Sequence, residues 1–180
     1  MKVACLHAHH SNKKYIDQLF SDVAHTVKPR IRKAEILATL ETLSQQADVV
    51  YMTCTDYIAQ IEGESVAPNI IKIDAPFFQL LAEHTGVQTL IFTNTATING
   101  TIARLHRTGK AVNYEIIMIE QAYELLLNGH KEAHDRLVIQ KLTELSTTGR
   151  NLAVAQLSLV DAAEAVDATI LHPLMSLQLV

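Results

Sequence analysis

The sequence predicts an α/β protein with two pseudo-symmetric lobes, whose parallel sheets are covered by helices and whose site lies in the cleft between the lobes. Short apolar runs alternate along the chain with segments whose apolar residues recur at helical spacing. Such alternation is typical of parallel sheets covered by helices. The order of these pieces also repeats between two approximate halves, 1–87 and 88–180, so the 180 residues form one unit of two similar lobes. If the lobes pack face to face, their strand ends converge on one cleft.

The first half contains three predicted strands. Its elements are, in order, a strand over 2–6, a helix through Tyr15, Ile16, Leu19, Phe20 and Val23, a helix over 36–47, a strand over 48–54, a strand over 69–73 and a helix begun by Asp74 and Pro76. The strands are short and mostly apolar, and the one that ends at Cys54 is β-branched, whereas the helices have apolar residues three or four apart. Pro29 separates the first two helices because proline breaks a helix interior.

The second half repeats this order. Its elements are a strand over 88–92, a helix through Ile98, Ile102 and Leu105, a segment over 111–119, a helix over 137–145, a strand over 152–156 and a short strand over 167–171. Gly109 closes the first of these helices, since glycine readily adopts the left-handed conformation found there. The segment 111–119 is ambiguous between strand and helix, because a short apolar run does not fix its own period.

Composition excludes several classes of protein. Apolar residues make up 48% of the chain and charged residues 19%, which is typical of a globular domain and not of a disordered one. The net charge of -4 offers no basic face for nucleic acid. The apolar runs are too short for a secretory signal or a membrane span, so a soluble cytoplasmic protein is expected. Cys5 and Cys54 both fall in predicted strands and are expected to be reduced thiols, with Cys5 in the core.

Cys54 is the most informative residue of the chain. The apolar run over 48–52 stops at this thiol, which is flanked by Thr53 and Thr55. Ligands of open α/β sheets bind outside the carboxyl ends of the strands, so the thiol is expected where chemistry would take place. A following helix would lower its pKa through backbone N–H groups and the positive end of the helix dipole. The alternative is a small apolar residue that finishes a core strand.

A second polar cluster follows the strand over 88–92. It consists of Thr93, Asn94, Thr95 and Thr97. Together with the hydroxyls beside Cys54, these uncharged donors suit a substrate carboxylate or a developing enolate. The alternative interpretation is a polar turn with a helix cap, because threonine and asparagine commonly begin helices.

Histidines flank two of the strand ends. His7, His9 and His10 follow the first strand, and we expect His7 or His9 to contact substrate or to influence Cys54. His172 follows the last strand and has the ordinary pKa of a proton donor. No metal site is expected, since the chain is too short for the large barrels with a metal-binding His-x-His and shows no matching later ligands. The helical histidines need no function; they are His25, His84, His106, His130 and His134.

Four segments together resemble the aspartate/glutamate/hydantoin racemase superfamily. They are Thr-Cys-Thr at 53–55, Ile-Asp-Ala-Pro at 73–76, Leu-Ile-Phe-Thr-Asn-Thr-Ala-Thr at 90–97 and Ala-Gln-Leu-Ser at 155–158. Their order and spacing carry the resemblance, which spans about residues 45–173. It implies two α/β lobes around a small carboxylate, with one cysteine from each lobe on opposite sides of the α-carbon and no cofactor. Such proteins are often dimers, so the resemblance also allows a homodimer.

The chain departs from that pattern at the second cysteine. Cys54 matches the first cysteine, but Gln156 occupies the second position, with Ser158 two residues later. Glutamine has no titratable proton near neutral pH and cannot act as the opposing acid or base. One-sided chemistry therefore remains open, as in arylmalonate decarboxylase-like or maleate isomerase-like enzymes.

The resulting prediction is a cofactor-independent racemase-like or isomerase-like enzyme that transfers a proton at the α-carbon of an amino acid or hydantoin. Cys54 and His172 are the predicted catalytic residues. The predicted substrate-binding residues are His7, His9, Thr53, Thr55, Asp56, Thr93, Asn94, Thr95, Thr97, Gln156 and Ser158. Two other classes stay open. One is a non-catalytic binder of a small carboxylate, and the other is a flavodoxin-like nucleotide binder, although the glycine pattern that cradles phosphate is missing.

Overall fold

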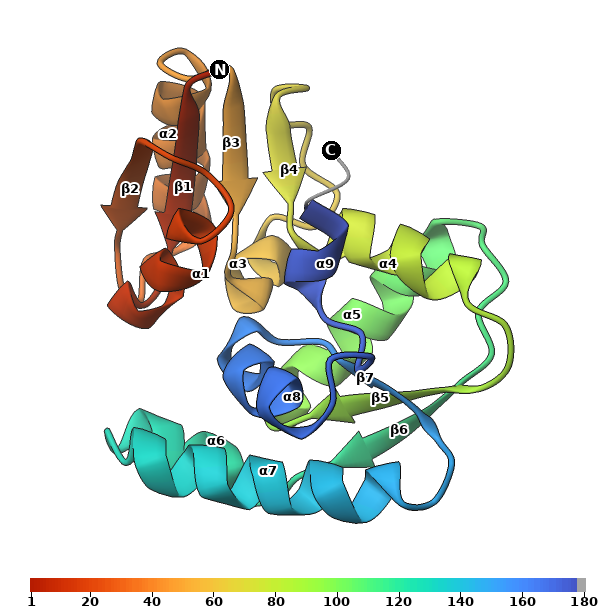
Figure 1. The fold of residues 1–180 in the computed structure, drawn as a ribbon. Helices are drawn as coiled ribbons and strands as arrows, with labels where there is room; N and C mark the ends of the chain where they lie inside the picture. Colours follow the sequence, from red (N-terminus) through yellow and green to blue (C-terminus); the bar gives the residue numbers. More distant parts are fainter. Residues whose placement is uncertain (178–180) are drawn as a thin grey trace. The chain divides into compact units, whose positions relative to one another are not determined.

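The computed structural model describes residues 1–177, which form two compact units, Met1–Pro76 and the part that begins at Phe77 (Figure 1). Each unit contains one sheet in which all strands run parallel. Helices connect consecutive strands in both units, as parallel pairing requires. The predicted α/β class with two parallel sheets flanked by helices is therefore confirmed.

The first unit has a four-stranded sheet in the order β2-β1-β3-β4. Its strands are β1 (Val3–His7), β2 (Val23–Val27), β3 (Val49–Met52) and β4 (Ile70–Lys72). Its helices are the 3-10 turn η1 (His10–Asn12), α1 (Lys13–Asp17), α2 (Lys33–Ser44) and α3 (Thr55–Gln60), and α4 (Asp74–Glu83) begins in it. The central strand β1 is buried along its whole length. Helix α2 packs against β1 and β3 through its buried apolar face, which includes Ile36 and Leu40.

The second unit has a three-stranded sheet in the order β6-β5-β7. Its strands are β5 (Gln88–Phe92), β6 (Tyr114–Met118) and β7 (Asn151–Val154). Its other helices are α5 (Thr95–Arg107), α6 (Ala122–Leu127), α7 (Lys131–Ser146), η2 (Leu157–Leu159), α8 (Val160–Val166) and α9 (Pro173–Leu177). A single parallel bridge between Ala153 and Leu171 adds the beginning of a fourth strand beside β7.

The two sheets share one topology. In each, the first strand lies between the second and the third, and the fourth pairing lies beyond the third. Val3 of β1 pairs with Val49 of β3, and Gln88 of β5 pairs with Asn151 of β7. Cys54 and Gln156 each lie two residues beyond the third strand of their sheet, and so occupy equivalent positions.

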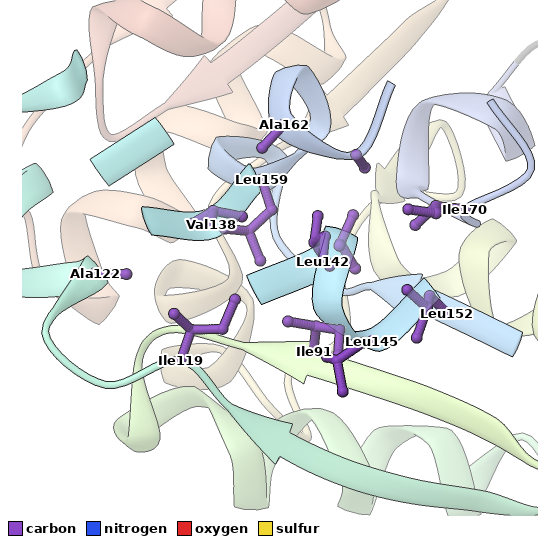
Figure 2. Close-up of a cluster of buried hydrophobic side chains, with 12 residues drawn as sticks. Ile91, Ile119, Ala122, Val138, Leu142, Leu145, Leu152, Leu159, Ala162 and Ile170 are labelled. Atoms are coloured by element: carbon purple, nitrogen blue, oxygen red, sulfur yellow. The ribbon is translucent and has the colours of Figure 1, made fainter. Parts of the chain in front are cut away.

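The core of the second unit covers both faces of its sheet. Consecutive residues of a strand point to opposite faces, and Ile91 and Phe92 of β5 accordingly belong to different buried clusters. On one face, Ile91 meets Leu142 and Leu145 of α7, as Figure 2 shows. On the other face, Phe92 packs in a cluster with residues of α4 and α5, including Leu105. Strand β5 is therefore the centre of this unit.

Several predicted elements differ from the structure. Residues 15–23 do not form one helix, because α1 ends at Asp17 and Val23 begins β2. Asp22 adopts a left-handed φ of 60° between these elements, which a continuing helix would exclude. The predicted strand over 167–171 is reduced to the bridge at Leu171. The ambiguous segment over 111–119 contains β6. Gly109 lies just beyond α5 with a φ of 68°, as predicted.

No helix within residues 1–177 combines the length and the apolar character that crossing a membrane requires.

Candidate functional site

Cys54 lies two residues beyond β3, at the carboxyl edge of the first sheet. Its backbone is extended, with φ of −98° and ψ of 114°, and the residue is the N-cap of α3. The strand before it is buried at Val50, Tyr51 and Met52, whereas Cys54 is half-buried. The apolar strand thus delivers the thiol to a partly accessible strand end, the position predicted from the sequence.

The pKa of Cys54 is raised to about 11. Burial is the largest cause, because it disfavours the charged thiolate. Backbone N–H groups of Tyr57 and Asp56 act in the opposite direction, as expected at the start of a helix, but their effect is smaller. The predicted lowering of this pKa is therefore wrong, and the thiol holds its proton at neutral pH.

A chain of hydrogen bonds runs from the residue beside Cys54 to the surface. Thr53 Oγ1 lies 2.8 Å from His7 Nδ1, and His7 Nε2 lies 2.8 Å from His25 Nδ1. His25 Nε2 lies 2.8 Å from Oδ1 of the exposed Asp17. The expectation that His25 is helical is therefore wrong: the residue belongs to β2, and each of its ring nitrogens lies within hydrogen-bond distance of a neighbour.

The other predicted residues of the first unit differ in accessibility. His7 and Thr53 are buried, and Thr55 is half-buried. Asp56 is exposed and accepts a hydrogen bond of 3.0 Å from Gln60 Nε2. His9 is exposed at the start of η1. The carboxyl ends of β1 and β3 thus bring together His7, Thr53 and Cys54, with Thr55 next in the chain.

In the second unit, Gln156 is bonded to the end of β5. Its Oε1 accepts hydrogen bonds from Thr93 N at 2.9 Å and from Thr93 Oγ1 at 3.0 Å. This pair joins the ends of β5 and β7, the strands that correspond to β1 and β3. Ser158 lies in η2, two residues beyond Gln156, and is half-buried.

The cluster at 93–97 begins α5. Asn94 is the N-cap, and its Oδ1 accepts a hydrogen bond of 3.0 Å from Ala96 N. Thr97 Oγ1 donates to Asn94 O at 2.8 Å. Thr95 is exposed. Asn94 and Thr97 therefore act as capping residues, because their side-chain oxygens form hydrogen bonds with backbone groups at the start of α5.

His172 follows the bridge at Leu171 and is only 4% exposed. Its Nδ1 has no hydrogen-bond partner among the described residues, and its Nε2 lies 3.6 Å from Glu164 Oε1. Burial lowers the pKa of His172 to about 4. The expectation of an ordinary histidine pKa at this position is therefore wrong, and the imidazole is neutral at pH 7.

Buried neutral histidines make both units sensitive to acid. Burial is also the main cause that lowers the pKa of His7 to about 4. Histidine in an unfolded chain has a pKa of about 6.5, so the unfolded chain binds protons first as the pH falls. We expect each unit to keep its full stability above about pH 6.5 and to lose about 3 kcal/mol between there and about pH 4.

Urea denaturation followed by circular dichroism across this pH range measures the loss. His172→Gln should flatten the part of the profile that belongs to the second unit, whereas His84→Gln, at an exposed position, should leave the profile unchanged. An unchanged acid profile in His172→Gln would contradict the assignment of this loss to His172.

Comparison with known proteins shows similarity in structure and none in sequence. No protein-family model and no curated protein sequence matches the chain. The structure is similar to that of glutamate racemase from Francisella tularensis subsp. tularensis SCHU S4 in complex with D-glutamate, with a TM-score of 0.62. Sequence identity is 10%, over 98% of this chain and 78% of that chain. The two proteins therefore share a fold.

Proposed function

We propose that this chain is a cofactor-independent, isomerase-like enzyme that transfers a proton at the α-carbon of a small carboxylate through the Cys54 thiol. The observation that carries the proposal is the position of Cys54 at the carboxyl end of β3, within a fold similar to that of a glutamate racemase. Ligands of open α/β sheets bind beyond this end of the strands. Cys54 is half-buried and is therefore partly accessible to a substrate.

The reaction needs one proton carrier. The Cys54 thiolate takes the proton from the α-carbon, and the electron pair of the broken C–H bond moves into the carboxylate to give an enediolate. Return of the proton from the Cys54 thiol restores the C–H bond and the thiolate. The backbone N–H groups of Tyr57 and Asp56 favour the charged form of Cys54, although less than burial disfavours it.

The position equivalent to Cys54 in the second unit holds a group without acid–base chemistry. Gln156 has no titratable proton, and its carbonyl oxygen is already bonded to Thr93. We therefore propose that Cys54 exchanges the proton on one face of the α-carbon with configuration retained, which is one half of an isomerisation; net inversion needs a proton delivered to the opposite face. Two opposed thiols would instead invert the configuration.

In each unit taken by itself, the proposed substrate contacts are hydroxyl groups near the strand ends. Thr55 and Ser158 are half-buried and Thr95 is exposed. Among the described residues, none of these three hydroxyls is engaged in a hydrogen bond, in contrast to Thr53, Thr93 and Thr97. Uncharged donors of this kind can hold a carboxylate or stabilise a developing enediolate, at about 3 kcal/mol for one well-aimed donor.

Proton NMR in D2O tests the proposal. Separate enantiomers of amino acids and hydantoins are incubated with wild type, Cys54→Ala, Cys54→Ser and the control Thr42→Ala, which removes an exposed hydroxyl from α2. We expect wild type and Thr42→Ala to place deuterium at the α-carbon with configuration retained. Both Cys54 variants should lose at least about a thousandfold in rate, because neither side chain is a usable base.

Two outcomes would contradict the proposal in different ways. If no compound exchanges while one binds wild type and Cys54→Ala equally, the chain is a carboxylate-binding protein and Cys54 is a packing residue. If exchange requires Cys54 but inverts configuration, a second proton donor exists and the one-face mechanism is wrong.

One observation favours a second candidate, one-sided decarboxylation. A thiol with a pKa of about 11 is protonated at neutral pH and is therefore an acid before it is a base. Such a group suits protonation of the enediolate that remains after a substituted malonate loses CO2. Substituted malonates in the same NMR panel test this candidate, with release of CO2 and Cys54-dependent formation of a monoacid as the expected result.

A further inference from the structure

Three potential metal ligands lie on one face of the first sheet. Cys5 pairs with His25 across β1 and β2, so their side chains point to the same face. His7 lies two residues after Cys5 on β1 and shares that face. One ligand atom from each of these three side chains lies within 4.8 Å of the other two. We define Cys5, His7 and His25 as the buried triad.

The hydrogen bonds around the triad allow one pair of tautomers in which two lone pairs face each other. The Thr53 hydroxyl donates to Leu6 O at 3.2 Å, so its oxygen remains to accept from His7 Nδ1 at 2.8 Å. The carboxylate of Asp17 accepts from His25 Nε2. When both of these outer nitrogens carry hydrogen, His7 Nε2 and His25 Nδ1 confront each other at 2.8 Å as acceptors. In this arrangement a bound cation, either a proton or a metal ion, relieves the repulsion between the two lone pairs.

We infer that the buried triad binds a divalent transition-metal ion of the Zn²⁺ class, through Cys5 Sγ, His7 Nε2 and His25 Nδ1. Thiolate and imidazole are the ligands that Zn²⁺ prefers. Metal-bound histidines usually donate their other N–H to a carboxylate or another oxygen. Asp17 and Thr53 occupy these outer positions. The site does not use Cys54, which is the thiol of the proposed reaction.

The two nitrogens of the triad need to move apart only slightly to hold the ion. Two nitrogens bound tetrahedrally to Zn²⁺ lie about 3.3 Å apart, compared with 2.8 Å between His7 Nε2 and His25 Nδ1. His25 belongs to the edge strand β2, and Asp17 beside it is 55% exposed, so the ion has a route from the surface. Three protein ligands leave a fourth position for water or another small ligand.

Titration with Co²⁺ tests the inference, because Co²⁺ replaces Zn²⁺ and is coloured. We expect one Co²⁺ per wild-type chain, with visible bands of a tetrahedral site and a thiolate-to-cobalt charge-transfer band. Cys5→Ser should remove the charge-transfer band, whereas the control Cys54→Ser should retain it. His84→Gln, which replaces an exposed histidine, should bind like wild type.

If the variants of buried residues fail to fold, Asp17→Asn still tests the inference, because Asp17 is on the surface. Its loss should weaken Co²⁺ and Zn²⁺ binding by about 10–100-fold, the usual effect of removing an outer partner, and His25→Gln should weaken binding at least as much. The inference is overturned if wild type binds no Co²⁺, or if the charge-transfer band is lost in Cys54→Ser and kept in Cys5→Ser. It is also overturned if His25→Gln and Asp17→Asn both bind Co²⁺ as tightly as wild type.

Discussion

Exchange at the α-carbon is expected to accelerate by about tenfold per pH unit between about pH 7 and pH 10, if the Cys54 thiolate is the base. The pKa of Cys54 is raised to about 11, so only a small fraction of the thiol is ionised at neutral pH. The ionised fraction grows with pH until the pKa is reached. The total increase over this range is about a thousandfold, provided that the fold persists.

Initial exchange rates measured by NMR at a series of pH values check this result, with Cys54→Ala as the background. The alkylation rate of Cys54 by iodoacetamide, measured by mass analysis of its peptide, should rise in parallel and separates Cys54 from Cys5. A rate that is already constant from pH 7 would contradict the raised pKa. Decarboxylation with the thiol as acid behaves differently, since its rate should stay level through neutral pH.

Replacing Phe92 by alanine is expected to lower the free energy of unfolding of the second unit by about 3–5 kcal/mol. Phe92 is fully buried in the central strand β5 and packs in a cluster with Phe77, Leu105 and Leu171. Its removal deletes an aromatic side chain and leaves a cavity between elements that are far apart in sequence.

Urea denaturation followed by circular dichroism measures this loss. Leu127→Ala is the matched control, since Leu127 is 58% exposed and a surface substitution usually changes stability by less than about 0.5 kcal/mol. A loss below about 1 kcal/mol in Phe92→Ala would show that this side chain is not central to the core.

Elements with a strong local pattern could be predicted from the sequence. The run over 88–92 contains Leu90, Ile91 and Phe92 and is followed by a capping asparagine, and it forms β5 with these bounds. Strand β2 could not be found in this way. Val23 continues the helical spacing of Leu19 and Phe20, and the strand itself is only half-buried because it lies at the edge of the sheet.

Some features of the candidate site likewise depend on neighbouring residues in the sequence, and others depend on residues that are far away in the sequence. The position of Cys54 follows from the residues around it, because an apolar strand ends there. Its pKa does not, since burial depends on what packs over the thiol and outweighs the local N–H groups. The pairing of His25 with Cys5 likewise depends on the register between two strands. No local pattern in the sequence signals that register.

The orientation of the Gln156 amide has a consequence for recognition. A backbone N–H can only donate, so Thr93 N fixes the carbonyl oxygen of Gln156 toward itself and excludes the flipped amide. Only the NH2 group of Gln156 is left for other partners. This group is a donor at every pH, unlike a thiol or an imidazole. A ligand bound through this group would therefore have to present a hydrogen-bond acceptor, in acid as well as in base.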